Sequence, residues 1–188
     1  TKPQDAESKY AVQRPPARIT QQCLDRCKGP VLVVHDEYDN LQTATPKRPP
    51  LKIVACVSSN HVSKAVFDLS SSLCRGGDSL KVVTFALPQE MEVPGWNELD
   101  RLYLDYQAEC AKLALAQPEV EVDALLLPRS TDVAESILAY CEAEKCDLVV
   151  MGSIELSEPK KVIFLGQVCS AVTAACRVHT LVVKNFVT

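Results

Sequence analysis

The sequence has few aromatic residues, no long apolar run and no excess of positive charge. Aromatic residues make up 5% of its 188 residues, and the formal net charge is -4. Without a basic stripe or a row of stacking aromatics, nucleic-acid binding is not expected. No apolar segment approaches the roughly 18 to 20 residues of a membrane-spanning helix, and the N-terminus lacks the basic and apolar regions of a signal peptide. We therefore expect a cytoplasmic protein that binds neither nucleic acids nor membranes.

Paired metal-binding cysteines are also lacking, although the chain contains nine cysteines. None of them forms a CxxC pair, and Cys23 and Cys27 have no matching pair downstream, so a structural zinc site is not supported. His35, His61 and His179 are distant from one another in the sequence, and no nucleophile, base and acid converge on them. We expect reduced thiols packed as small apolar side chains, and neither a metal nor a catalytic centre.

The apolar content, by contrast, is that of a folded domain. Hydrophobic residues make up 47% of the chain and charged residues 23%, which is close to the average for soluble globular proteins. The length suffices for one domain with a substantial core and an appendage, but not for two domains of ordinary size.

Short apolar runs alternate with amphipathic helical segments from Leu51 onward. The strand-like runs lie at residues 51–57, 80–87, 120–127, 147–151 and 180–183. They are nearly continuous in apolar residues, as is typical of strands covered on both faces. The alternation predicts an α/β fold, namely an open, doubly wound sheet of five parallel strands. Ligands bind such sheets at the carboxyl ends of the strands where strand order reverses, so the loops after the first and fourth strands are the candidate site.

The ends of this region resemble a known family. The segments "DLVVMGS", "LGQVCSAVTAAC" and "HTLVVKN" resemble the C-terminal signature of the universal stress protein family, and "LKIVACVSS" resembles its first strand. The resemblance implies a Rossmann-like fold of the adenine nucleotide alpha hydrolase type. It also implies dimers formed through the last strand, and an ATP site in some members.

The phosphate-binding loop of that family, G-x-x-G-x9-G-[ST], is only partly retained. Gly152 matches the first glycine, and Gly166 fits the last one with one extra residue in the spacer. Glu155 and Gln167 stand where the family has a glycine and a hydroxyl residue, and Ser58 stands where nucleotide-binding members usually carry aspartate. Because a carboxylate facing a triphosphate is unfavourable, we expect a degenerate nucleotide site without a cofactor.

The alternative is that ATP or AMP still binds at this loop. The residues around the phosphates would be Gly152, Ser153, Lys160, Lys161 and Gly166, with Ser58 near the base or ribose. The lysines would replace missing amide donors as point charges, and Gly166 still precedes the N-terminus of a predicted helix.

The first fifty residues contain a segment that is similar in sequence to the C-terminal segment. The segment "ITQQCLDRCKGPVLVVHD" aligns without a gap with "VCSAVTAACRVHTLVVKN", so that Cys27 matches Cys176 and Leu32 matches Leu181. This internal similarity predicts that residues 18–36 form a helix-strand arm, equivalent to the end of a preceding repeat in a tandem protein. A chance likeness of two amphipathic helix-strand patterns is the alternative.

The arm strand needs a partner, because its backbone N–H and C=O groups cannot remain unpaired. We expect Val31–Val34 to pair antiparallel with the edge strand Thr180–Val183, within one chain or in a homodimer. Residues 1–17 are expected to be a disordered tail and residues 37–50 a linker to the domain at 51–188. The sequence thus predicts a non-enzymatic module that acts through dimerisation or domain assembly.

Overall fold

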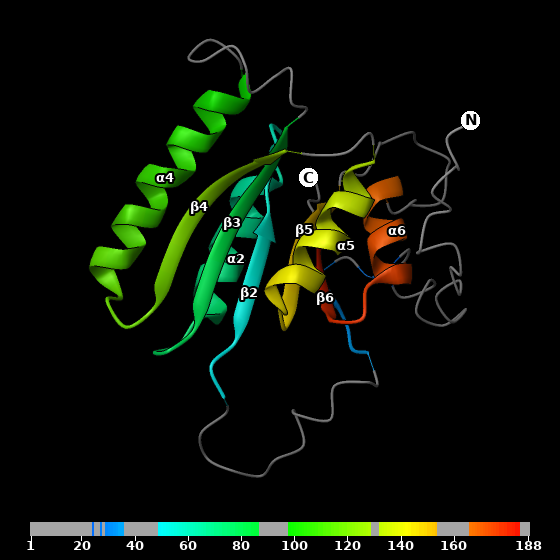
Figure 1. Ribbon diagram of the computed structural model, residues 1–188, viewed down its shortest axis with the longest axis horizontal. Helices are drawn as coiled ribbons and strands as arrows, with labels where there is room; N and C mark the ends of the chain where they lie inside the picture. Colours follow the sequence, from blue (N-terminus) through cyan, green and yellow to red (C-terminus); the bar gives the residue numbers. More distant parts are fainter. Residues whose placement is uncertain are drawn as a thin grey trace, which may run out of the picture.

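The computed structural model describes residues 24, 27, 29–35, 49–86, 98–128, 132–153 and 166–184. The strands are β1 (Val31–Val33), β2 (Lys52–Cys56), β3 (Ser79–Ala86), β4 (Glu121–Pro128), β5 (Leu148–Ser153) and β6 (His179–Lys184). The helices are α2 (Ser63–Leu73), α4 (Glu98–Ala116), α5 (Val133–Glu144) and α6 (Gln167–Ala175). Figure 1 shows the strands as one sheet with helices on both sides. The predicted tail (1–17), most of the predicted linker and the predicted ligands Lys160 and Lys161 lie outside the described residues.

The sheet confirms the predicted α/β architecture. Its six strands follow the order β1-β6-β5-β2-β3-β4. The strands β2 to β6 are parallel to their neighbours, as predicted, and β1 is antiparallel to β6. Strand order reverses between β2 and β5, which are adjacent although most of the domain separates them in the sequence. The loops after these two strands therefore meet at the carboxyl edge of the sheet, where such folds bind ligands.

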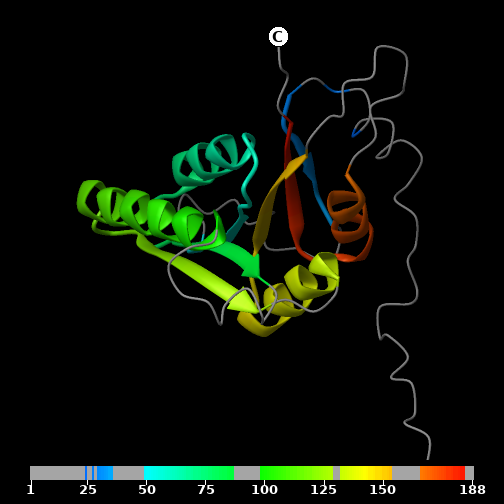
Figure 2. The ribbon, with the colours of Figure 1, turned by 90° about the horizontal axis from the view of Figure 1, so that it is seen from above.

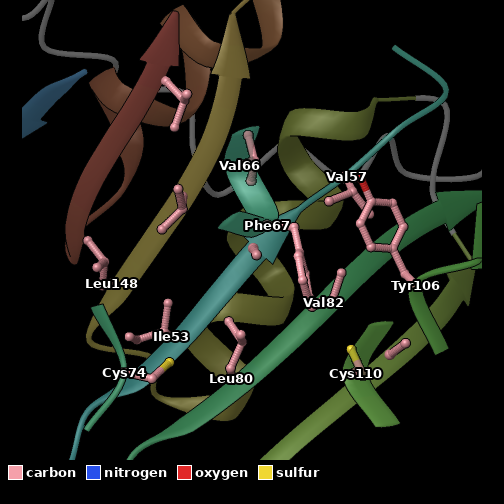
Figure 3. Close-up of a cluster of buried hydrophobic side chains, with 14 of the residues drawn as sticks. Ile53, Val57, Val66, Phe67, Cys74, Leu80, Val82, Tyr106, Cys110 and Leu148 are labelled. Atoms are coloured by element: carbon pink, nitrogen blue, oxygen red, sulfur yellow. The ribbon is translucent and has the colours of Figure 1, made fainter. Parts of the chain in front are cut away.

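Each face of the sheet carries its own hydrophobic cluster. The first cluster joins Ile53 and Val150 of the sheet to α2 and α4, and part of it is drawn in Figure 3. Phe67 of α2 and Tyr106 of α4 meet there with ring centroids 5.6 Å apart. The second cluster joins Val54 to α5 and α6 on the opposite face of the sheet. Figure 2 shows the ribbon of the sheet and these helices from above. Because alternate residues of β2 enter opposite clusters, the strand is apolar throughout, as its sequence indicates.

Helix α5 has a side-chain cap at its N-terminus. The side chain of Asp132 accepts a hydrogen bond of 2.8 Å from the backbone N–H of Ala134, and Lys145 ends the helix in a left-handed conformation. Asp132 thus satisfies one of the backbone donors that the start of a helix leaves open.

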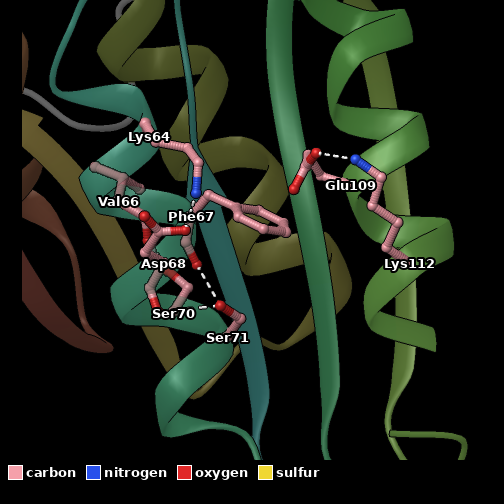
Figure 4. Close-up of polar contacts among 8 residues, drawn as sticks. All are labelled: Lys64, Val66, Phe67, Asp68, Ser70, Ser71, Glu109 and Lys112. Carbon is pink, nitrogen blue, oxygen red and sulfur yellow. Dashed lines mark hydrogen bonds and ion pairs between the residues drawn. The ribbon is translucent and has the colours of Figure 1, made fainter. Parts of the chain in front are cut away.

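One pair of charged residues on α2 and one on α4 form contacts within their own helix (Figure 4). Lys64 pairs with Asp68, and its Nζ lies 5.7 Å from the centroid of the Phe67 ring. The Nζ of Lys112 lies 2.6 Å from Oε1 of Glu109. Such exposed pairs contribute little to stability. These charges belong to solvated helix faces rather than to a binding site.

Candidate functional site

The turn after β2 is closed by its own side chains. The Oγ of Ser63 donates to the carbonyl oxygen of Ser58 at 2.7 Å and accepts from the Ser58 N–H at 2.9 Å. The Oδ1 of Asn60 accepts from the N–H groups of Val62 and Ser63 at 3.0 and 3.1 Å, and its Nδ2 donates to the Ser58 hydroxyl. Ser58, the predicted nucleoside contact, therefore already has intramolecular partners. The first N–H groups of α2 likewise face a side-chain oxygen of the chain itself.

Gly152, at the end of β5, is held by packing. A β-carbon at this position would lie 2.9 Å from Cγ1 of Val62 and 3.3 Å from Cγ2 of Val66. Both valines are fully buried, so neither has open space to move into. Real β-carbons essentially never approach another atom within 3.0 Å. The close approach of α2 to β5 thus accounts for this glycine without a phosphate.

Ser153 and Gly166 meet across the loop that separates them in the sequence. The N–H of Gly166 donates to the Oγ of Ser153 at 3.4 Å, and Ser153 is buried. A β-carbon on Gly166 would meet nothing within 4 Å. Gly166 is the N-cap of α6, and no side chain among the described residues caps this helix. The start of α6 is accordingly the part of the site with room and with a helix dipole that favours an anion.

The structure therefore gathers four of the six predicted site residues at one edge of the sheet. Ser58 follows β2, Gly152 lies near the end of the paired strand β5, and Ser153 contacts Gly166 directly. The predicted ligands Lys160 and Lys161 fall outside the described residues, as does Glu155. Sequence reasoning missed Asn60, Ser63 and Val62. The cluster "SSNHVS" before a helix is nevertheless typical of side chains that cap backbone groups.

Two of the three histidines meet, but away from this edge. The N–H of His35 donates to Nδ1 of His179 at 3.4 Å. His179 opens β6, whereas the candidate site lies at the carboxyl ends of the strands. Burial lowers the pKa of the His179 imidazole. Within residues 24–184, as far as the structure describes them, no group of histidine, cysteine and carboxylate side chains could hold a metal ion.

The cysteines of the second cluster are buried thiols. Cys141, Cys146, Cys169 and Cys176 lie between the sheet, α5 and α6. Burial raises the pKa of Cys169 to about 12. A hydrogen bond from Cys141 lowers the pKa of Cys176. These four cysteines thus pack as small side chains, as the sequence predicts, whereas Cys27 is exposed. None of the described cysteines forms a disulfide.

Comparison with known proteins defines the family. The model of the universal stress protein family matches residues 51–184, the part of the chain that forms the parallel sheet and its helices. The chain therefore belongs to the universal stress protein family. The search of curated proteins returned no match. None of the helices in the described parts of the chain is long and apolar enough to cross a membrane.

Solved structures share this fold at low sequence identity. A universal stress protein from Archaeoglobus fulgidus is 15% identical, with a TM-score of 0.53, and the match covers 73% of this chain and 96% of that one. A universal stress protein solved in complex with cAMP is 16% identical, with a TM-score of 0.54 and coverages of 73% and 99%.

A longer structure matches more of this chain. It is a universal stress protein from Archaeoglobus fulgidus DSM 4304, 15% identical, with a TM-score of 0.61, and the match covers 89% of this chain but 54% of that one. Residues 51–188 make up less than three quarters of this chain. The match to the longer structure therefore includes residues upstream of Leu51.

Proposed function

We propose that the protein is a non-enzymatic universal stress protein-type module that acts through association at the β6 edge of its sheet. In this proposal the nucleotide site at the loops after β2 and β5 is degenerate and binds no ATP or AMP. One observation supports the second part: packing against Val62 already explains Gly152, the residue that matches the first glycine of the family loop, without a phosphate.

The turn after β2 supports the same conclusion. A ligand contacting Ser58 would compete with the hydrogen bonds that Asn60 and Ser63 already make to it. Because Ser58 is exposed, water can replace its broken partners, and the cost of each bond is the net value of about 0.5–1.5 kcal/mol. Glu155 and Gln167 stand where the family loop carries glycine and a hydroxyl. Nucleotide binding would thus require breaking hydrogen bonds in the turn after β2, and it would lack two of the family's residues in the loop after β5.

The test is mass spectrometry under native conditions of protein purified without added nucleotide. We expect the mass of the bare chain, and no binding when ATP or AMP is titrated. A restoring variant, Ser58→Asp/Glu155→Gly/Gln167→Ser, returns the family residues and is expected to gain ATP affinity relative to the wild type. Stoichiometric ATP or AMP in the wild-type protein would overturn the proposal.

The association part of the proposal rests on β6. Members of the family commonly form dimers, and β6 carries the partner strand β1 on its outer side. A homodimer and an intramolecular pairing of tandem type both use this edge.

A nucleotide-binding switch is the second candidate function. The open start of α6 at Gly166 favours it, because a helix N-terminus without a side-chain cap attracts anions. The structure of a relative in complex with cAMP makes a nucleotide a reasonable probe. If this candidate is correct, Lys160→Met/Lys161→Met weakens AMP binding at least tenfold in calorimetry, because two cationic contacts to the phosphate are lost. If the first proposal is correct, neither protein binds AMP.

A further inference from the structure

Two of the buried thiols meet between helices α5 and α6, which lie side by side on one face of the sheet (Figures 1 and 2). Cys141 belongs to α5, and Cys176 is the C-cap of α6, where the chain leaves the helix in an extended conformation. A hydrogen bond joins their side chains. Cys141 is 3% exposed and Cys176 is 5% exposed. Sulfur atoms that are already hydrogen-bonded need only a small approach to form a disulfide bond of about 2.05 Å.

Cys176 differs from the neighbouring thiols in the direction of its hydrogen bonds. The Sγ atoms of Cys146 and Cys169 donate to backbone carbonyl oxygens at 3.3 and 3.2 Å, which favours the protonated thiol. The sulfur of Cys176 instead accepts from four donors, namely the thiol of Cys141, the N–H groups of Val178 and Arg177, and the hydroxyl of Thr180. Such donors stabilise the negatively charged thiolate. They lower the pKa of Cys176, with the hydrogen bond from Cys141 as the largest cause, although burial opposes the shift.

The two sulfur atoms therefore have different chemical roles. The thiolate is the nucleophilic form of cysteine, and a second thiol beside it can close a disulfide once the first sulfur is oxidised. We propose that Cys176 and Cys141 form a site of reversible oxidation by hydrogen peroxide, in which Cys176 reacts first and Cys141 closes the disulfide. The site lies at the end of α6 opposite to Gly166. It goes beyond the proposed function, because it requires neither a nucleotide nor association at β6.

The reaction has two steps. The Cys176 thiolate attacks one oxygen of hydrogen peroxide, so that an S–O bond forms and the O–O bond breaks; the departing hydroxide takes up a proton and becomes water. Cys176 is then a sulfenic acid. The Cys141 sulfur attacks the sulfenic sulfur, an S–S bond forms, and the S–O bond breaks, while the departing hydroxide and the Cys141 proton give a second water. Two thiols are thus oxidised to one disulfide, one peroxide is reduced to two waters, and the end of α6 is tied to α5.

The burial of the pair determines which oxidant fits. Cys176 leaves little of its surface open to solvent, so the oxidant must be small. Hydrogen peroxide is close to water in size, whereas glutathione disulfide and aromatic disulfide reagents are far larger. Cys27 is exposed and is the described cysteine that such large reagents reach first. The oxidant that suits the Cys176 sulfur is therefore a small peroxide rather than another disulfide.

Peptide mapping of the full chain tests the site. The reduced protein is treated with one equivalent of hydrogen peroxide, the remaining thiols are blocked with N-ethylmaleimide in urea, and the chain is digested with trypsin without reduction. Trypsin cuts after Lys145 and so separates Cys141 from Cys146. We expect the peptide with Cys141 to be linked to the peptide that contains Cys169 and Cys176, and fragmentation should place the bond at Cys176. Dithiothreitol should release the two peptides.

Cys110 provides a matched control within the same chain. It is 4% exposed, which is close to the exposure of Cys176, but it lies in the first hydrophobic cluster, and burial raises its pKa to about 11. Among the described residues, no hydrogen bond joins it to another thiol. In the folded protein, peroxide should consume the Cys176 thiol at least about tenfold faster than the Cys110 thiol. In urea the two rates should become equal, because the hydrogen bonds to Cys176 are lost.

Three variants separate the roles of the sulfur atoms. Cys141→Ser removes the thiol that closes the disulfide, so peroxide should leave Cys176 as a sulfenic acid that dimedone labels when it is added with urea. Cys176→Ser should leave Cys141 as a thiol. Cys146→Ser removes the other thiol that is hydrogen-bonded to Cys141 and should form the same disulfide as the wild type. Circular dichroism checks that each variant is folded, and the map of the wild-type chain decides the question without them.

A map in which Cys141 is linked to Cys146 would overturn the proposal. So would equal rates at Cys176 and Cys110 in the folded protein. These outcomes are separable from the proposed function. A protein that carries stoichiometric nucleotide but forms the Cys141–Cys176 disulfide overturns the degenerate nucleotide site and keeps the thiol pair. A nucleotide-free protein that does not form this disulfide keeps the degenerate site and overturns the thiol pair.

Discussion

Lys184, near the end of the described chain, donates a hydrogen bond to the backbone carbonyl of Leu24, 160 residues earlier. Replacing it by methionine keeps an apolar stem but removes the donor from two carbonyl groups, those of Leu24 and Cys27. We expect Lys184→Met to lower the free energy of unfolding by about 1–3 kcal/mol and to speed amide exchange in residues 29–35. Urea unfolding and hydrogen exchange measure these effects. Lys64→Met, on an exposed helix face, should change neither; equal behaviour of the two variants would contradict the anchoring role.

Because Val62 lies close to Gly152, we expect an alanine substitution to destabilise the protein more at Gly152 than at Gly166. Gly152→Ala should destabilise the protein by about 1–3 kcal/mol, because the new methyl group overpacks a buried site. Gly166→Ala should cost less than Gly152→Ala, about 1 kcal/mol or less, because alanine is a poorer N-cap than glycine but, among the described residues, nothing lies within 4 Å of its would-be β-carbon.

A double-mutant cycle in urea tests this explanation. Val62→Ala opens space beside residue 152, so its cost should be smaller in the Gly152→Ala background than in the wild type. Additive costs would show that Val62 is not the neighbour that requires a glycine.

Asp78 clamps the turn before β3 onto the start of β2. It is 2% exposed, and its two carboxylate oxygens accept from the N–H groups of Leu51 and Arg75, each at 2.8 Å. Asp78→Ala leaves both donors without this acceptor, and we expect a loss of about 2–4 kcal/mol in urea unfolding. Asp68→Ala removes an exposed carboxylate from α2 and should stay within about 0.5 kcal/mol of the wild type. Similar losses for the two variants would argue against the clamp.

His179 should make stability depend on pH. Burial lowers its pKa in the folded protein from the ordinary 6.5, while the Asp147 carboxylate opposes this shift. The unfolded chain therefore takes up a proton on His179 before the folded protein does. Its contribution to stability is fully present above the ordinary value and is lost as pH falls towards the folded pKa.

The measurement is the free energy of unfolding between about pH 7.5 and pH 5.5. His179→Gln, which keeps an acceptor for the His35 N–H, should flatten part of the wild-type decline. A decline of the same size in the His179 variant would rule out this histidine as its source.

The positions of the strands could be predicted from the sequence, whereas some of their ends could not. The continuous apolar runs predict the five parallel strands because each strand is buried on both faces. The predicted fourth strand ends at Met151, whereas β5 continues to Ser153 because Gly152 and Ser153 pair with Val183 and Lys184. The predicted third strand stops at Leu127, whereas β4 includes Pro128; β4 is an edge strand, where proline is tolerated.

The sequence by itself determined the order of elements, the family pattern and the edge on which Val31–Val33 lies, because these follow from local periodicity and from an internal match. Only the tertiary structure decided that Val62 lies beside Gly152, that Asn60 and Ser63 occupy the polar groups of Ser58, and that Lys184 holds the arm. The physical reason is the same in each case. Such contacts depend on the distance and direction of side chains from separate segments, which spacing along the chain does not specify.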